Sequence, residues 1–297
     1  MPTADPTAGH VARPGWTDPV PFWLRPTSYW MPEQHPASAW VTHAPFAAWL
    51  VDVLRPREVV ELGTHNGFSC FAFAEAAKRL GLPVRVNALD SWSGDEHAGF
   101  YGEAVYEAVR AVVERDYPSV RMLRGFFSES RPLFDDASVD LLHIDGRHFY
   151  DDVVEDYTEW VTTVRDGGIV LFHDIAVRDR GFGVWRLWDE LAEPGRSFAF
   201  SHGHGLGVLV IGTVPDGPIR ELVTADDETA ERIRADFERL GDAVAERYRL
   251  ERLRPQLARL EGRLTASRAR IGYLESSASW RLTAPLRAIR RRLPGSR

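Results

Sequence analysis

The sequence predicts an α/β protein whose doubly wound, mainly parallel, seven-stranded sheet ends in an antiparallel hairpin and precedes a helical, coiled-coil-like extension. Short apolar runs alternate with amphipathic stretches over the central part of the chain. The last two apolar runs, Phe198–Ser201 and Leu206–Ile211, are joined by a segment too short for a helical crossover. Beyond about residue 225 the chain becomes highly charged, with leucines at heptad-like spacing.

The predicted elements follow one another in a regular order. Apolar residues at helical spacing predict helices, and the apolar runs between them predict strands. The helices are predicted at Ala44–Leu54, Ser69–Leu80, Gly102–Asp116, Tyr150–Val164 and Phe182–Leu191, and the strands before the hairpin at Glu58–Leu62, Val84–Leu89, Val120–Arg124, Val139–Ile144 and Ile169–Phe172. Because parallel strands need crossover connections, this alternation places helices on both faces of the sheet.

Four regions follow from these patterns: an irregular N-terminal arm (1–40), the α/β domain (41–215), a helical stalk (225–275) and a basic amphipathic tail (276–297). The arm is rich in proline and has no sustained period, and it is expected to pack through its aromatic residues Trp16, Trp23, Tyr29 and Trp30.

The stalk carries its apolar residues at Leu250, Leu253, Leu257, Leu260, Leu264, Ile271 and Leu274. This spacing predicts a helix that pairs with itself or with a partner. Pro255 is expected to interrupt the run and to restart it as an early helical residue.

Composition excludes several functional classes. No apolar run approaches the roughly 20 residues needed to span a bilayer, and the N-terminus has no secretory pattern, so a cytoplasmic protein is expected. Cys70 is the only cysteine, which excludes a disulfide within the chain and a multi-cysteine metal site. Lys78 is the only lysine, so Schiff-base or phosphate-loop chemistry would depend on that residue. The net charge of −7 argues against a nucleic-acid partner.

A glycine turn follows the first predicted strand. Glu61 ends the apolar run, and Gly63 and Gly67 form a Gly-x-x-x-Gly pattern in which the backbone can turn tightly beside a ligand. This is not the Gly-x-Gly-x-x-Gly fingerprint of dinucleotide-binding proteins. Asp90 ends the next strand, where an acid can accept hydrogen bonds from a ribose diol. The alternative is that Glu61 and Asp90 are solvated strand ends.

A second group of polar residues follows two later strands. Asp145 closes one strand with His148 three residues on, and His173 and Asp174 close the next. Adjacent parallel strands place their carboxyl ends side by side, so these side chains should converge. Carboxylates suit Mg²⁺, and a histidine can take a proton from a hydroxyl. The alternative is that the histidines are hydrogen-bonded structural residues, which suits His143 best because it lies inside a strand.

Residues 38–212 resemble class I S-adenosylmethionine-dependent methyltransferases, specifically the branch near the macrolide-sugar and bacterial-glycan O-methyltransferases. The resemblance is carried, in the expected order, by the strings VVELGTHNGFS, NALDSWSGD, LLHIDGRHFY, GGIVLFHD, FGVWRLWDEL and HGHGLGVL. It implies that S-adenosylmethionine is the cofactor, with its methionine end at the glycine turn, its ribose at Asp90 and its adenine near residues 125–128. The expected cofactor-binding residues are Glu61, Gly63, Asn66, Gly67, Asp90, Phe127, Ser128 and Asp145.

The resemblance also implies methylation of a hydroxyl on a sugar or glycoside. A metal ion, Mg²⁺ with Mn²⁺ as the alternative, would be held by Asp145, Asp174 and His173. His148 is expected to be the general base, since the macrolide-sugar branch has a histidine where catechol O-methyltransferases have a lysine. The chain departs from metal-dependent relatives, which tend to have a third oxygen ligand beside the second aspartate, because His173 and Ile175 flank Asp174 here.

Two other functions compete with this reading. A nicotinamide-dependent oxidoreductase would need the dinucleotide fingerprint or a Tyr-x-x-x-Lys motif, and the sequence has neither. A non-catalytic scaffold in a glycan-assembly complex is harder to separate, although Asp145, His148 and Asp174 favour an enzyme.

The expected partners are a sugar- or glycan-containing acceptor and, through the stalk, a second copy or a glycan-assembly protein. The tail places Leu286, Ile289 and Leu293 beside arginines, a pattern typical of helices that lie on anionic membranes, here at the inner face. His202 and His204 are candidates for the acceptor pocket.

Overall fold

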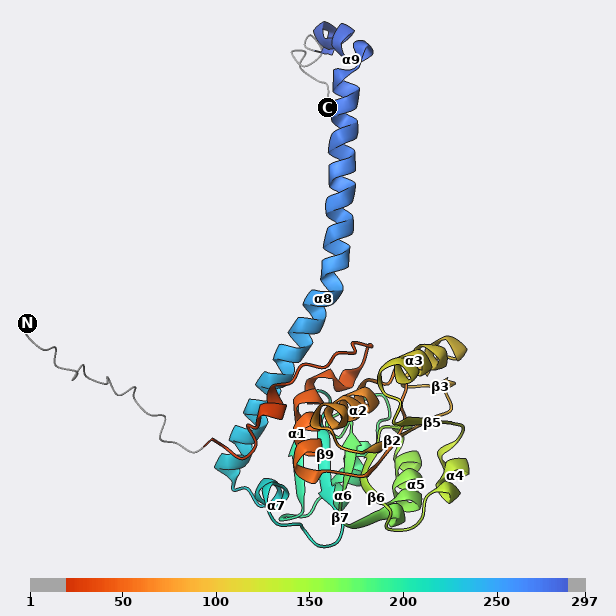
Figure 1. The fold of residues 1–297 in the computed structure, drawn as a ribbon, viewed down its shortest axis with the longest axis vertical. Helices are drawn as coiled ribbons and strands as arrows, with labels where there is room; N and C mark the ends of the chain where they lie inside the picture. The colour runs from red at the N-terminus through yellow and green to blue at the C-terminus, as the bar shows by residue number, and fades with distance from the viewer. Residues whose placement is uncertain (1–19, 288–297) are drawn as a thin grey trace, which may run out of the picture. The chain divides into compact units, whose positions relative to one another are not determined.

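The computed structural model describes residues 20–287, so Trp16 of the predicted arm and the end of the predicted tail, including Ile289 and Leu293, lie outside the described residues. Its centre is a seven-stranded sheet in the order β5-β2-β1-β6-β7-β9-β8 (Figure 1). The strands are β1 (Glu58–Leu62), β2 (Arg85–Asp90), β5 (Val120–Arg124), β6 (Val139–Ile144), β7 (Val164–His173), β8 (Ser197–Phe200) and β9 (Leu206–Val210).

The first five of these strands in the sheet order are parallel, and β9 runs antiparallel to both β7 and β8. The predicted fold class is therefore confirmed, including the terminal hairpin. The hairpin forms because only residues 201–205 connect β8 to β9, and so short a connection can join only antiparallel neighbours.

The predicted helices are present with small changes at their ends. They are α1 (Ala44–Leu54), α2 (Phe68–Leu80), α3 (Glu103–Asp116), α5 (Tyr150–Trp160) and α6 (Val184–Leu191). The helix predicted to continue to Val164 ends at Trp160, because a 3-10 turn at Val161–Thr163 leads directly into β7. β7 starts at Val164 rather than at Ile169, and its register with β6 shifts between Val139 and Leu141.

Several short elements have no counterpart in the sequence prediction. A two-stranded ribbon, β3 (Gly94–Asp95) with β4 (Gly99–Phe100), follows β2, and α4 (Phe127–Ser130) follows β5. α7 (Pro218–Val223) lies between β9 and the long C-terminal helix. Elements this short bury too few residues to produce a detectable period.

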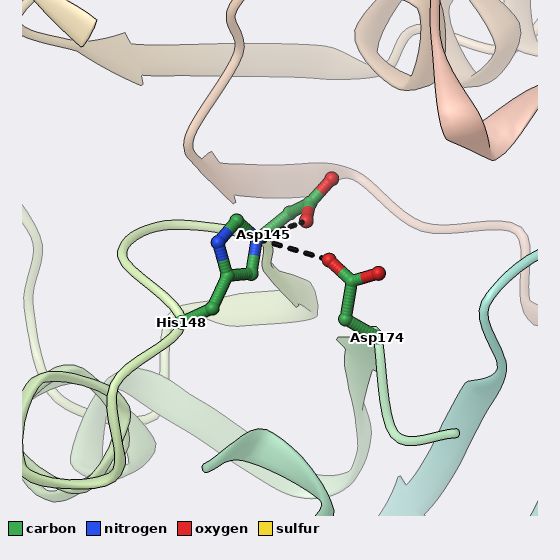
Figure 2. A group of neighbouring side chains, drawn as sticks. All are labelled: Asp145, His148 and Asp174. Atoms are coloured by element: carbon green, nitrogen blue, oxygen red, sulfur yellow. Dashed lines mark ion pairs between the residues drawn. The ribbon is translucent and has the colours of Figure 1, made fainter. Parts of the chain in front are cut away.

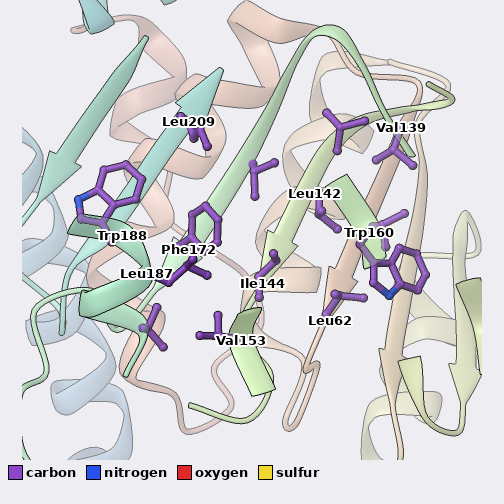
Figure 3. Packing of buried hydrophobic residues seen from close by; sticks show 14 of the residues in the cluster. Leu62, Val139, Leu142, Ile144, Val153, Trp160, Phe172, Leu187, Trp188 and Leu209 are labelled. Atoms are coloured by element: carbon purple, nitrogen blue, oxygen red, sulfur yellow. The ribbon is translucent and has the colours of Figure 1, made fainter. Parts of the chain in front are cut away.

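An apolar core packs between one face of the sheet and the helices α5 and α6 (Figure 3). Trp160 and Val153 come from α5, and Leu187 and Trp188 from α6. They cover strand residues that are almost fully buried, including Leu62, Leu142, Ile144, Phe172 and Leu209. A core packed this closely holds the strands in a fixed register, which fixes the positions of the polar residues that follow them.

The described part of the N-terminal arm packs onto the domain through its tryptophans, and the ring of Trp30 lies 3.9 Å from the guanidinium of Arg79. Trp23 is buried and its indole N–H donates to Asp236 over 2.9 Å. Trp40 is buried at the end of the arm, in a 3-10 turn at Ala39–His43. The expectation that Tyr29 also packs is wrong, because 57% of its surface is exposed.

The chain divides into two compact units, residues 1–244 and 245–297. One helix, α8 (Asp227–Ser276), contributes to both; within the first unit it buries Ile233, Phe237 and Val244. Within the second unit its heptad leucines are exposed, and the short helix α9 (Ala278–Leu282) follows. Among residues 20–287, no helix combines the length and apolarity needed to cross a bilayer.

The helix α8 runs through Pro255 without a break, so the predicted interruption is wrong. With Leu250 at heptad position a and Leu253 at position d, Pro255 occupies position f, on the side of the helix away from the leucines. Its missing N–H leaves the carbonyl of Glu251 on that outer side, where water can hydrogen-bond to it.

Candidate functional site

A cavity of about 800 Å³ lies at the carboxyl ends of the central parallel strands. Its wall contains the acids at the ends of three strands: Asp90 is the last residue of β2, Asp145 follows β6 and Asp174 follows β7. Carboxyl ends of parallel strands meet at one edge of a sheet, which is where ligands bind in such folds. The predicted cofactor residues Gly63, Asn66, Phe127 and Ser128 also line this cavity.

The two glycines of the turn have different tasks. Gly63 has a φ of +95°, and a Cβ there would overlap the carbonyl oxygen of Asp145. Its lack of a side chain thus lets the ends of β1 and β6 approach each other. Gly67 precedes α2 with a φ of +85°, and a Cβ there would lie 2.6 Å from the ring of Phe71. Gly67 does not line the cavity, so its role in the structure is to form the turn.

Glu61 is fully buried and lies behind the cavity wall rather than on it. The indole N–H of Trp40 donates to Nε2 of His143 over 3.1 Å, so His143 carries its proton on Nδ1. That Nδ1–H faces Oε1 of Glu61 at 3.0 Å. Within the described residues, Oε2 of Glu61 has no hydrogen-bond partner. His143 is therefore the structural histidine that the sequence suggested.

The carboxylate of Asp90 is held by backbone groups of the surrounding turns. Oδ2 accepts from the N–H of His65 at 2.7 Å and Oδ1 from the N–H of Trp92 at 2.6 Å. The hydroxyl of Tyr101 also donates to Oδ2, at 3.3 Å, and its ring stacks on His65. Burial raises the pKa of Asp90, an effect that these hydrogen bonds oppose. Asn66 donates its amide to the carbonyl of Ala37.

Asp145, His148 and Asp174 form one cluster on the cavity wall, and their side chains point toward one another (Figure 2). Nε2 of His148 lies 3.0 Å from Oδ2 of Asp174 and 3.5 Å from Oδ1 of Asp145. One oxygen or nitrogen from each of the three side chains lies within 4.8 Å of the other two, close enough to bind one metal ion. The predicted convergence of these strand-end residues is thus present.

His173 occupies a different position from the one expected of a metal ligand. Its Nδ1 lies 3.2 Å from Oδ1 of Asp145 and 3.4 Å from Oδ2 of Asp174, and its Nε2 lies 3.0 Å from the carbonyl oxygen of Gly203. Both nitrogens face oxygens, an arrangement that suits a doubly protonated imidazolium. Burial opposes this charge, but the two aspartates outweigh burial and raise the pKa of His173.

The charges of the cluster compensate one another. Burial lowers the pKa of His148, but hydrogen bonds to Asp145 and Asp174 more than offset it and raise the pKa to about 9. Burial likewise disfavours the ionised form of Asp145, but His173 and His148 lower its pKa to about 2, and the same histidines lower the pKa of Asp174. Two carboxylates beside two imidazolium rings make a site that can exchange protons for a metal ion.

His204, one of the two predicted acceptor-pocket residues, lines the cavity and places Nδ1 3.0 Å from Oδ1 of Asp174, whereas the other, His202, does not line it. Two further cavity residues, His97 and Phe182, were not found from the sequence. The rings of Phe182 and His148 are stacked with centroids 4.6 Å apart, and His97 packs against Phe182. Short turn segments supply these residues, so no periodicity signalled them; the spacing of three positions from Asp145 to His148 and the string HGHG were the usable clues.

Backbone strain is concentrated around the cavity. His65, Asp174 and His204 all have positive φ values, of 48°, 62° and 70°. Residues other than glycine adopt this conformation at an energetic cost, and such residues cluster where ligands bind or chemistry takes place.

Comparison with known proteins agrees with this architecture. Residues 60–175 match the family model described as a methyltransferase domain, Methyltransf_24. The matched part contains the glycine turn, Asp90, Asp145, His148 and Asp174. The sheet order is the predicted one, and over residues 60–175 the chain is similar to a methyltransferase domain.

Particular relatives were found by sequence and by structure. An uncharacterized protein of Sinorhizobium fredii, y4gI, is 50% identical over 177 residues, which are 60% of this chain and 20% of that protein. The chain thus spans about a fifth of the length of the curated relative that it matches.

Among solved structures, an O-methyltransferase from Bacillus cereus is 20% identical, with a TM-score of 0.46, over 61% of this chain and 84% of that one. TomG from Streptomyces achromogenes, an O-methyltransferase involved in tomaymycin synthesis, is 18% identical, with a TM-score of 0.46, over 61% and 83%. Likenesses at this level say nothing about the acceptor of this chain.

Proposed function

We propose that the chain transfers a methyl group from S-adenosylmethionine to a hydroxyl of a sugar or glycoside. One observation carries the proposal: Asp145, His148 and Asp174 meet in the same cavity as Asp90 and the glycine turn. A base, two carboxylates and a cofactor-binding edge are thus within one chamber, which is what the methylation of a poorly acidic hydroxyl requires.

The cavity suits the cofactor in charge and size. S-adenosylmethionine carries a positive sulfonium, and the strand-end carboxylates supply negative charge around it. Oγ1 of Thr64, in the glycine turn, is buried and has no partner among the described residues, so it is free to bind a ligand group. A volume of about 800 Å³ lies within the usual range of roughly 300–1,000 Å³ for ligand pockets.

The donor set also fits a divalent cation. Asp145 and Asp174 would hold Mg²⁺, which commonly takes one or two protein carboxylates and keeps several waters. When bound, the ion would lower the pKa of the acceptor hydroxyl and orient it. His173, with both nitrogens facing oxygens, would hold the two carboxylates in place rather than bind the ion itself.

His148 is proposed as the general base. Its ring is fixed between the two aspartates on one side and Phe182, on which it stacks, on the other. With its pKa raised to about 9, His148 accepts a proton only in its neutral form, which becomes populated as the pH rises toward 9. Held in one orientation, the neutral ring would remove the hydroxyl proton without first losing rotational freedom. The aromatic side chains of His97 and Phe182 give the acceptor end a flat, partly apolar wall beside polar groups, a combination common in small-molecule sites.

Three measurements test the proposal. Thermal shift with S-adenosylmethionine and with NADH should give stabilisation by the first alone; stabilisation by NADH would favour an oxidoreductase. Mass spectrometry of products from a panel of nucleotide sugars and glycans should reveal a gain of one methyl group. If S-adenosylmethionine binds but no acceptor in a broad panel is methylated, the result would favour a non-catalytic scaffold over an enzyme. Exhaustive chelation should abolish methylation, and activity that survives it would remove the metal from the mechanism.

The stalk and the tail are proposed to serve assembly. The leucine stripe of α8 would pair with a second copy or with a glycan-assembly protein. The arginine-rich tail would touch the anionic inner face of a membrane.

A further inference from the structure

Asp156 lines one corner of the cavity and is not part of the Asp145, His148 and Asp174 cluster. It lies on α5, which follows His148, and its side chain is half-buried. Among residues 20–287, no side chain or backbone group forms a hydrogen bond or an ion pair with its carboxylate. A carboxylate that lines a ligand cavity without a partner is available to a donor on the ligand.

An aromatic ring and a bare stretch of backbone adjoin this carboxylate on the cavity wall. A Cβ built on Gly146 would lie 2.7 Å from the ring of Phe127 and 2.9 Å from Oδ2 of Asp156. The phenylalanine ring, the bare backbone of Gly146 and the carboxylate therefore meet at one place on the cavity wall. An aromatic ring and a glycine beside it suit a flat heteroaromatic group, and the carboxylate at its edge suits an amino substituent.

We infer that Asp156 accepts a hydrogen bond from the 6-amino group of the adenine of the cofactor and makes the site selective for 6-aminopurines over 6-oxopurines. The inference rests on the proposed function, because it assumes that the cavity binds S-adenosylmethionine. A 6-oxo group presents lone pairs to the carboxylate instead of N–H donors, so the two oxygens would repel each other.

The charges around Asp156 agree with this role. Burial, followed by the neighbouring carboxylates of Asp152, Glu155 and Glu159, raises the pKa of Asp156 to about 7. Negative charge is therefore crowded here, and a ligand that donates hydrogen bonds relieves this crowding. All three of these acids line the cavity together with Asp156, so this corner favours ligand groups that donate hydrogen bonds over groups that accept them.

The test compares two cofactor products, S-adenosylhomocysteine and its 6-oxo analogue S-inosylhomocysteine, by calorimetry on the full chain at pH 8, where Asp156 is ionised. The wild type should bind the 6-amino compound at least about tenfold more tightly, the usual value of a hydrogen bond to a charged group. Asp156→Ala should reduce this preference to less than about threefold. Asp151→Ala, on the exposed side of the same helix, is the matched control and should keep the full preference.

Asp156→Asn provides a second variant of the same shape. Its amide can donate to the 6-oxo group or accept from the 6-amino group, so it should bind S-inosylhomocysteine more tightly than the wild type does. An unchanged preference in both Asp156 variants would overturn the inference while leaving cofactor binding intact. Failure of the wild type to bind S-adenosylhomocysteine at all would overturn the proposed function, and this inference with it.

Discussion

His148 is the residue on which the chemistry of the site depends most. Its Nε2 faces both carboxylates, and its Nδ1 is buried without a partner among the described residues. Nε2 of His148, which faces the carboxylates, could therefore bind a metal ion or take a proton. His173, which the sequence suggested as a metal ligand, instead has an oxygen beside each of its ring nitrogens. The proposed roles of the two histidines, His148 as the base and His173 as the residue that holds the carboxylates, follow from the oxygens that their ring nitrogens face.

Replacing His148 by alanine should lower turnover by about 10²- to 10⁴-fold, the usual contribution of general-base catalysis. Affinity for S-adenosylmethionine should change little, because no predicted cofactor contact is removed. Single-turnover kinetics and calorimetry would measure the two quantities separately. His202→Ala is the control, since His202 does not line the cavity, and near-wild-type turnover in His148→Ala would exclude His148 as the base.

Gly63 is expected to be more sensitive to substitution than Gly81, which also has a positive φ. Gly63→Ala should reduce the free energy of unfolding by more than about 2 kcal/mol, since it adds a clash with the carbonyl oxygen of Asp145 to the cost of a positive φ. Gly81→Ala, also at positive φ but with open space around its Cβ, should cost only about 1 kcal/mol. Urea unfolding of both variants measures the difference, and equal losses would contradict the close approach of β1 and β6.

At the scale of elements, α8 combines two kinds of surface. Its first part buries apolar residues in the first unit, whereas its heptad positions from Leu250 onward are exposed. Position g of the same heptads carries Arg249, Gln256, Arg263 and Arg270, so three of its four residues are arginines. An exposed apolar stripe favours pairing, but a flank of like charges opposes pairing with an identical helix at low salt.

Self-association through α8 should therefore strengthen as salt rises, because screening weakens the repulsion between arginines. Leu257→Glu together with Leu264→Glu should leave the chain monomeric in sedimentation equilibrium, since each buried leucine contributes roughly 1.5–3 kcal/mol. Ala258→Glu, outside the stripe, should have no such effect. A wild-type chain that remains monomeric at every salt concentration would leave a different protein as the partner.

At the scale of the whole molecule, charge is divided unequally along the chain. Residues 245–297 contain fourteen arginines, four glutamates, no aspartate and no lysine, although the net charge of the full chain is −7. The first unit is thus strongly acidic and the second strongly basic. Such a division favours contact between the C-terminal region and an anionic surface and keeps the domain itself away from one.

Deleting residues 276–297 should abolish co-sedimentation with anionic liposomes at low salt and leave methylation of a soluble acceptor unchanged. The reason is that six arginines and the apolar residues between them are removed, whereas no cavity residue is. Liposomes of neutral lipid are the control. Absence of liposome binding by the full-length chain at low salt would contradict the membrane proposal and leave the partner proposal alone.

The sequence by itself determined the sheet, its hairpin and the set of residues that follow the strands. Apolar periodicity depends on neighbours within one segment, which is why Glu58–Leu62, Val120–Arg124 and Val139–Ile144 were predicted with the bounds that the structure has. The order of acids at strand ends was likewise visible, because a parallel sheet brings those ends together whatever its details.

Only the tertiary structure decided how those residues are used. Glu61 and Gly67 belong to the glycine turn in sequence, yet one bonds to His143 inside the core and the other packs on Phe71. Asp156 looks like any surface acid of a helix until α5 is packed against the sheet beside Phe127. Side-chain direction and burial depend on contacts between segments far apart in the chain, and local periodicity carries no information about them.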